Sequence, residues 1–301
     1  MTVEAILETL QKLQSKGDSI YPKGLFRSQR YHPFLPYRRD DDNLFFTASI
    51  VHILQEHQSC LTKIERGIAD RIIEIALSAY PLFRNKDGLD TYNFWRTKPT
   101  RHFPNGWLMH RFKHFQIPDD IDDTSLLFIT ETASKERVGR LRTKLQKHAN
   151  HAYKRAFNPL PKYRDLKVYS TFFGKNMYIE FDVCVLSNLM RLILKHFKDE
   201  LNEYDRDTLQ FITEVIASDE HTLLPFYSAP NYPTAELILY HVARLIPVLP
   251  DSHRDKILSK SINDLNRLVS RSKGLNRILI ENSLMRLGCH VKTIKHDMEG
   301  M

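Results

Sequence analysis

The sequence predicts an all-α protein: an α/α toroid, a closed ring of helical hairpins with inner and outer helices and almost no sheet. Three observations predict this fold. Apolar residues recur at helical spacing along nearly the whole chain. Mostly apolar segments alternate with segments that carry one apolar stripe and one charged face. The mostly apolar segments begin alike, with an acidic or small polar residue near the first turn. We therefore expect one toroid domain over residues 1–301, with the inner-helix N-termini facing one mouth.

The elements follow in order from the apolar periodicity. The first helix has Val3, Ile6, Leu7, Leu10 and Leu13 on one face. Helices are predicted near 2–16, 42–57, 62–80, 120–133, 135–156, 182–198, 205–218, 233–247, 252–271 and 275–289. Those near 42, 120, 182, 233 and 275 are mostly apolar, and those near 62, 136, 205 and 252 are amphipathic. An irregular insertion at about 81–118 is rich in aromatic residues and Pro, and only 168–173 (VYSTFF) resembles a strand.

Composition narrows the class of protein. The chain has 301 residues, 42% hydrophobic and 27% charged, which is typical of a globular protein. Glycine-rich phosphate loops, apolar stretches of ~18 residues and a signal peptide are all missing. Cys60, Cys184 and Cys289 lie far apart, which favours a reducing cytoplasm. The net charge of +8 suits an anionic substrate or a membrane surface, but its spread along the chain predicts no nucleic-acid partner.

Four carboxylates crowd the start of the helix near 120. Asp119, Asp120, Asp122 and Asp123 follow Pro118, a residue suited to a helix start. A rotation of roughly 100° per residue brings Asp119, Asp122 and Asp123 near one face. If that face is apolar, burial and repulsion raise at least one pKa and leave a carboxylic acid protonated at neutral pH. The alternative is a solvated helix cap.

The stretch Asp120-Ile-Asp122-Asp123-Thr124-Ser125 resembles the DxDD(T)(A/S) motif of class II terpene cyclases, the squalene–hopene and copalyl diphosphate cyclase superfamily. The resemblance implies an isomerase that cyclises a polyprenyl, isoprenoid substrate after protonating it. Asp122 is then the general acid, oriented and tuned by Asp120 and Asp123. Weaker similarity to cyclase toroids lies in the spacing of Asp182, Val185 and Asn188 and in the Tyr-Pro helix start at Tyr232. The resemblance therefore adds Asp182, Asn188 and Tyr232 as substrate-binding residues.

The chain departs from the family in two respects. Class II cyclases usually form their pocket between two helical domains, and this chain has room for one. It also lacks the repeated Gln–Trp motifs of triterpene cyclases, since Trp95 and Trp107 are its only tryptophans. Three possibilities therefore stay open: the chain works with a partner domain, it forms a homodimer, or it is a relative of the cyclases that has lost the cyclisation activity.

Aromatic and basic residues supply the remaining site candidates. A cyclase surrounds carbocations with aromatic faces, and the insertion supplies Tyr92, Phe94, Trp95, Phe103 and Trp107. The insertion either crosses the mouth that holds Asp122 or packs on the outside of the ring. Arg38 and Arg39, with Arg96, Lys98 and Arg101, are candidates to bind a diphosphate.

No cofactor and no metal site are predicted, although the acidic pairs Asp40–Asp42 and Asp119–Asp123 are candidates to bridge Mg²⁺ to the substrate if it is a diphosphate. Two other functions stay open. Paired carboxylates on α/α barrels also cleave glycans, with Asp182, Glu180 or Glu236 as the second acid. A non-catalytic toroid would instead bind a lipid or protein partner.

Overall fold

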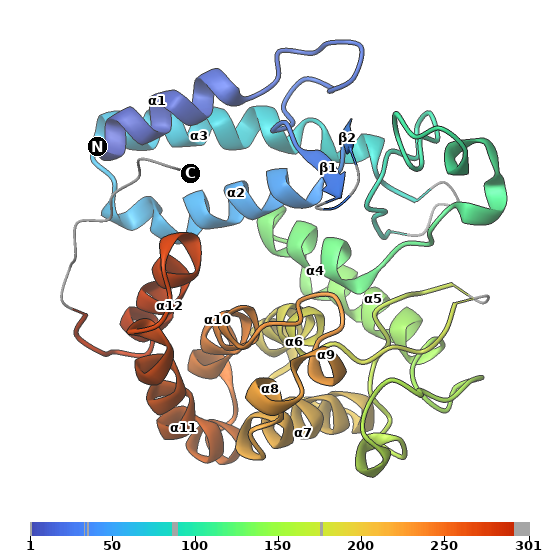
Figure 1. The fold of residues 1–301 in the computed structure, drawn as a ribbon, viewed down its shortest axis with the longest axis vertical. Coiled ribbons are helices and arrows are strands. Elements are labelled where there is room, and N and C mark those ends of the chain that lie inside the picture. The colour runs from blue at the N-terminus through green and yellow to red at the C-terminus, as the bar shows by residue number, and fades with distance from the viewer. Residues whose placement is uncertain (1, 33, 35, 86–89, 175–176, 292–301) are drawn as a thin grey trace. The chain divides into compact units, whose positions relative to one another are not determined.

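A computed structural model describes residues 2–32, 34, 36–85, 90–174 and 177–291 (Figure 1). It is mostly helical (57%), and the described residues form twelve α-helices and a single two-stranded sheet. The all-α prediction is confirmed. The chain divides into two compact units, residues 1–137 and 138–301. The closed ring and the single domain that the sequence predicts stay predictions.

Four helices build the first unit. They are α1 (Val3–Leu13), α2 (Phe45–His57), α3 (Lys63–Leu77) and α4 (Ile121–Thr130). Helix α3 packs against α1 and α2, and α2 packs against α4. Leu7, Val51 and Ile72 are buried where α1, α2 and α3 meet, so apolar side chains at helical spacing form this part of the core. A capping box of Thr62 and Glu65 begins α3.

The first unit also contains a β-hairpin that the sequence analysis missed. Strands β1 (Gln29–His32) and β2 (Tyr37–Asp40) are antiparallel, with Arg30 opposite Arg39. Most of the hairpin's side chains are exposed or half-buried. It therefore lacks the alternation of apolar and polar residues by which a sequence reveals a half-buried strand.

Between α3 and α4 the chain is irregular. The described residues of 83–118 form no α-helix and only two short 3₁₀ turns, η3 (Met109–Arg111) and η4 (Lys113–Phe115), after η2 (Tyr80–Leu82). Isolated β-bridges such as the one between Arg84 and Tyr92 hold its loops. Residues 86–89 lie outside the described part.

The second unit is built on two rows of helices. Its helices are α5 (Lys135–Gln146, which begins in the first unit), α6 (Val183–Phe197), α7 (Glu203–Ala217), α8 (Glu220–Leu223), α9 (Pro225–Ser228), α10 (Ala235–Leu245), α11 (Asp251–Val269) and α12 (Gly274–Arg286), with turns η5 (Pro161–Tyr163) and η6 (Ile246–Val248). Helix α10 packs between α6 and α12, while α7 packs against α11. Neighbours in sequence also pair, α6 with α7 and α10 with α11, as the predicted helical hairpins require.

Three local predictions were wrong. The helix predicted over 135–156 ends at Gln146, and residues 168–173 form no strand. Val168 and Tyr169 are fully buried, so their apolar character reflects burial of a loop rather than strand pairing. Helix α12 is not buried on several sides, as its predicted apolar character requires, since Leu275 and Met285 are exposed on it.

Candidate active site

The four aspartates at the start of α4 are all buried. Asp119, Asp120, Asp122 and Asp123 are 6%, 7%, 7% and 2% exposed. Asp120 is the N-cap, and its Oδ1 accepts a hydrogen bond of 2.8 Å from the backbone N–H of Asp123. A cap in water would leave most of these carboxylates solvated. The solvated-cap alternative is therefore inconsistent with their burial.

Asp119 ties the start of α4 to the irregular segment. Its Oδ2 accepts hydrogen bonds from Thr91 Oγ1 (2.6 Å) and Asn85 Nδ2 (2.5 Å), and its Oδ1 accepts a longer one from Asn93 Nδ2 (3.4 Å). The backbone N–H of Tyr92 donates to Thr124 Oγ1 at 3.0 Å. Sequence analysis missed Asn85, Thr91 and Asn93. The spacing of Thr91 and Asn93 could have identified them, because side chains two residues apart lie on the same side of an extended chain.

Asp120 and Asp123 form a hydrogen-bonded carboxyl pair in which both pKa values are raised. Burial raises the pKa of Asp120 to about 7, against the lowering effect of the N–H and carboxyl of Asp123. Burial, and then the negative charge of Asp120 and the hydrogen bond between the two carboxyl groups, hold the pKa of Asp123 well above its usual range. These effects favour the protonated form of Asp123, whose carboxyl group donates a hydrogen bond to that of Asp120.

One oxygen of this pair has no bond to satisfy it. Oδ1 of Asp123 is buried and has no hydrogen-bond partner among the described residues. Leaving a buried polar atom unpaired costs roughly 1–3 kcal/mol, and such atoms are uncommon in folded proteins. The start of α4 thus combines a carboxyl pair with raised pKa values and a buried oxygen without a hydrogen-bond partner among the described residues. The assignment of the transferred proton to Asp122 itself stays a prediction.

Tyr92 lies against α4 but within a polar network. Its ring is fully buried and 6.4 Å from that of Phe128. Its hydroxyl donates to Glu131 Oε1 at 2.6 Å and accepts from Arg84 (3.0 Å) and Arg137 (3.2 Å). Burial and the bond to Glu131 raise the pKa of the Tyr92 hydroxyl. These contacts anchor the irregular segment on α4.

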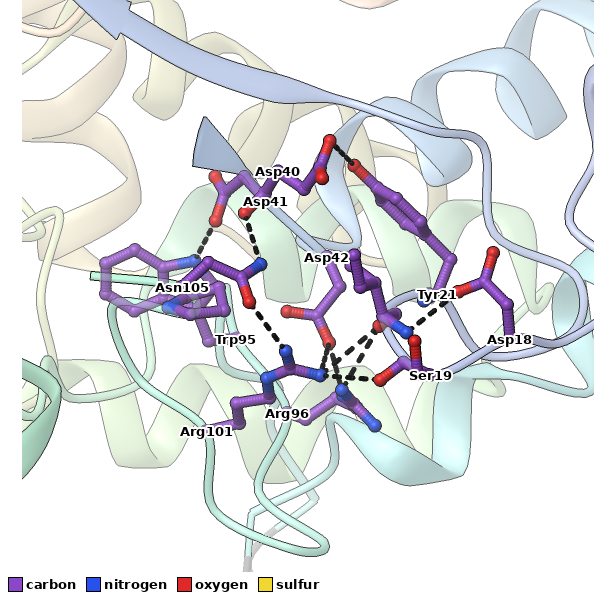
Figure 2. Close-up of polar contacts among 12 residues, drawn as sticks. Asp18, Ser19, Tyr21, Asp40, Asp41, Asp42, Trp95, Arg96, Arg101 and Asn105 are labelled. Carbon is purple, nitrogen blue, oxygen red and sulfur yellow. Dashed lines mark hydrogen bonds and ion pairs between the residues drawn. The ribbon is translucent and has the colours of Figure 1, made fainter. Parts of the chain in front are cut away.

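Trp95, Phe94 and Phe103 form an aromatic group, and Trp95 connects it to Asp41. The Trp95 ring lies 4.5 Å from that of Phe103 and 5.2 Å from that of Phe94, between centroids. Its Nε1 donates to Asp41 Oδ1 at 2.8 Å (Figure 2). Burial raises the pKa of Asp41, and the hydrogen bond from Trp95 opposes the rise. Trp107, by contrast, is 75% exposed, so the predicted aromatic residues do not form one group.

Two of the predicted diphosphate-binding arginines face a carboxylate instead. Arg96 forms an ion pair with Asp42, and Arg101 approaches the same carboxylate at 3.8 Å (Figure 2). Burial raises the pKa of Asp42 although both arginines lower it. Arg38 donates to Gln29 at 2.6 Å, and the guanidinium of Arg39 lies over the Trp107 ring. Of the four predicted arginines, only Arg38 and Arg39 thus lack a carboxylate partner among the described residues.

The remaining candidates lie in the second unit. Asp182 is fully buried and caps α6, accepting from the N–H groups of Cys184 (2.8 Å) and Val185 (3.2 Å). Its other oxygen accepts from the backbone N–H of Asn231 at 2.9 Å.

Asn231 also connects Asp182 with a neighbouring acid. Its Nδ2 donates to Glu180 Oε1 at 2.7 Å, and burial raises the pKa of Glu180. Further along α6, Asn188 Oδ1 lies 3.4 Å from both His241 Nδ1 and Arg244 Nη1. The ring of Tyr232 is 5.3 Å from that of His241. Glu236 lies half-buried in the first turn of α10.

The acidic, imidazole and thiol side chains do not gather into a metal-binding cluster. Within the described ranges, no group of three or more His, Cys, Asp or Glu side chains is arranged to hold an ion. Cys60, Cys184 and Cys289 are in the reduced thiol form. A helix with the length and apolar character needed to cross the bilayer is not found in the described part of the chain.

Comparison with known proteins identified no relative: no family model, no curated protein and no solved structure matches the chain.

Proposed function

We propose that the protein is a class II terpene-cyclase-like isomerase that cyclises an isoprenoid chain by protonating it. The observation that carries the proposal is the buried carboxyl pair of Asp120 and Asp123 beside Asp122, in which burial raises the pKa of both groups. An alkene is so weak a base that only a carboxylic acid in a dry site protonates it at a useful rate. The buried start of α4 supplies such an environment.

In the proposed reaction Asp122 transfers its proton to a terminal double bond or epoxide of the substrate. The carbocation that forms is attacked by the next double bond, so that a ring closes. The last cation then loses a proton to water, which restores an alkene, and Asp122 takes up a new proton from solvent. Because Asp123 stays protonated, the pair carries one negative charge rather than two. A single charge near Asp122 favours its protonated form before transfer and balances the carbocation afterwards.

The same pair is unsuited to glycan hydrolysis. Glycosidases place their two carboxyl groups roughly 5–9.5 Å apart, so that a sugar carbon or a water fits between them. Asp120 and Asp123 are hydrogen-bonded to each other, which leaves no such space. The acids Glu180 and Asp182 are both engaged by Asn231. The isomerase proposal therefore fits the carboxyl geometry better.

The proposal is tested by incubating the full chain with geranylgeranyl diphosphate, farnesyl diphosphate or squalene and analysing extracted products by mass spectrometry. In heavy water the product should gain one deuterium, because the initiating proton comes from an exchangeable carboxyl. A diphosphate substrate should keep its diphosphate, whereas ionisation by Mg²⁺ would release it.

Asp123→Asn serves as the variant, since its amide still donates to Asp120 but holds no titratable proton. We expect it to reduce turnover. Asp18→Asn is the matched control, because Asp18 is a loop aspartate that forms an ion pair with Arg27. Cyclised products without deuterium, or no product from any of the three substrates, would reject the proposal.

A further inference from the structure

An exposed surface of aromatic and basic side chains lies on the first unit. Its apolar members come from the β-hairpin (Tyr31 and Phe34) and from the segment around η3 (Trp107, Leu108, Met109 and Phe112), and its basic members are Arg38, Arg39, Arg111 and Lys113. We call these ten residues the aromatic–basic patch. Phe34 is 90% exposed, and Tyr31 and Trp107 are each 75% exposed.

Specific contacts hold the hairpin and the η3 segment together. Arg30 Nη2 donates to the carbonyl of Pro104 at 2.6 Å, and Asn105 Nδ2 donates to the carbonyl of Asp40 at 2.9 Å. The guanidinium of Arg39 lies 4.7 Å from the centre of the Trp107 ring. The β-hairpin and residues 104–107 are therefore adjacent, although they lie some 70 positions apart in sequence.

The two segments that supply the patch contain basic residues and no acidic residue. Residues 29–39 and 105–118 contain no Asp or Glu. The next acidic residues are Asp40, which accepts hydrogen bonds from Gln29 and Tyr21, and Asp119, which is buried. The surface is therefore complementary to an anionic partner that also has an apolar layer beneath its charges.

We propose that the aromatic–basic patch docks the protein on an anionic lipid surface. Trp and Tyr favour the interface between headgroups and acyl chains. Leu108, Met109 and Phe112 can enter the acyl boundary, while Arg38, Arg111 and Lys113 remain at the level of the headgroup phosphates. A nucleic acid would also attract the charges and stack on the aromatic rings, but it offers nothing apolar to Leu108 and Met109. A lipid surface uses both components.

This inference does not depend on the proposed chemistry, because none of the patch residues belongs to the carboxyl pair. A protein without cyclase activity would still dock, and an active cyclase that does not dock would reject only the present proposal.

The test is flotation of the full chain with vesicles of phosphatidylcholine alone and with vesicles in which about a third of it is replaced by phosphatidylserine. We expect binding to the anionic vesicles only, weakened by high salt. Arg111→Gln with Lys113→Gln should weaken binding about tenfold or more, and Trp107→Ala with Phe112→Ala should weaken it to a similar degree.

Matched controls lie elsewhere on the chain. Phe157 is 76% exposed, as Trp107 is, and Lys147 and Arg155 are exposed, as Arg111 and Lys113 are. Phe157→Ala, and Lys147→Gln with Arg155→Gln, should leave vesicle binding unchanged. Circular dichroism confirms that each variant is folded.

Three outcomes overturn the proposal: no binding to anionic vesicles, equal losses in patch and control variants, or tighter binding of a labelled single-stranded oligonucleotide that competes with the vesicles. The last outcome would assign the patch to nucleic acid.

Discussion

The starts of α4 and α6 look alike in sequence but differ in their bonding. Each helix begins at a buried aspartate cap, Asp120 in α4 and Asp182 in α6. Asp182 receives N–H groups from its own helix and from Asn231. Asp120 receives one backbone N–H and faces a second carboxyl, that of Asp123, one oxygen of which has no hydrogen-bond partner among the described residues.

The difference shows two ways in which a protein offsets the free-energy cost of burying a carboxyl group. A buried carboxyl group is stable if donors satisfy it, or if it keeps its proton. Asp182 follows the first course, and we expect its role to be structural. In our proposal the pair of Asp120 and Asp123 follows the second course, and its proton supports acid catalysis by Asp122. The predictions below are ordered from the largest expected effect to the smallest.

The largest expected effect is a loss of turnover on substitution at the start of α4, but not at the start of α6. Asp122→Asn should lower turnover of an identified substrate by roughly 10²–10⁴-fold, because an amide has no proton to transfer. Its free energy of unfolding should stay the same or rise, since one of four crowded carboxylates is removed. Steady-state kinetics and denaturant unfolding measure the two quantities.

Asp182→Asn is the counterpart in α6. It should lose stability while the turnover per folded molecule changes by less than about tenfold, which is below the usual contribution of a general acid. Equal turnover losses in both variants would erase the distinction between the two starts.

Removal of the α6 cap should have the next largest effect. Asp182→Ala should lower the free energy of unfolding by about 2–3 kcal/mol, because it leaves the N–H groups of Cys184, Val185 and Asn231 unpaired in a buried site. Urea denaturation measures the loss. Thr62→Ala, at the exposed cap of α3, is the control and should cost about 1 kcal/mol. A loss at Asp182 no greater than at Thr62 would contradict the structural role.

The carboxyl pair should give stability an unusual pH dependence. Because the folded pKa values of Asp120 and Asp123 are raised, the folded state binds more protons than the unfolded state above about pH 4. Their contribution to stability is therefore fully present below about pH 4 and declines as the pH rises toward 7. In Asp123→Asn this decline should shrink by at least about 1 kcal/mol, the equivalent of one unit of pKa.

Denaturation at a series of pH values measures that decline. Asp18→Asn is the control: the backbone N–H groups of Tyr21 and Ile20 lower the pKa of Asp18, so its contribution is lost only as the pH falls below about 4. Identical slopes between pH 4 and 7 in the wild type and Asp123→Asn would show that the pair holds no extra proton.

The smallest effect concerns the link between α4 and the irregular segment. Thr91→Val keeps the shape of the side chain but removes the hydroxyl that donates to Asp119. We expect a loss of about 1 kcal/mol, since Asn85 still donates to the same oxygen. Thermal melting measures it, with the exposed Thr9→Val on α1 as control. A negligible change would mean that the aspartate cluster does not depend on this segment.

The sequence by itself determined most of the helices. A helical periodicity is a local pattern, and a few turns of sequence are enough to recognise it. One example is the spacing of Val3, Ile6, Leu7 and Leu10 on one face. The same locality placed the start of α4 near Pro118 and Asp120, to within a residue of its observed cap. The β-hairpin escaped notice because exposed strands lack a buried face, and a loop such as 168–173 was mistaken for a strand because burial alone selects apolar residues.

Only the tertiary structure decided which carboxyls are satisfied. Nothing in the order of residues shows that Asn231 reaches Asp182, that Thr91 reaches Asp119, or that Arg96 turns to Asp42 rather than to a substrate. Likewise Trp95 and Trp107 belong to one irregular segment, yet one is buried against Asp41 and the other is exposed beneath Arg39. Periodicity is encoded over neighbouring residues, whereas protonation and exposure depend on partners brought from distant parts of the chain.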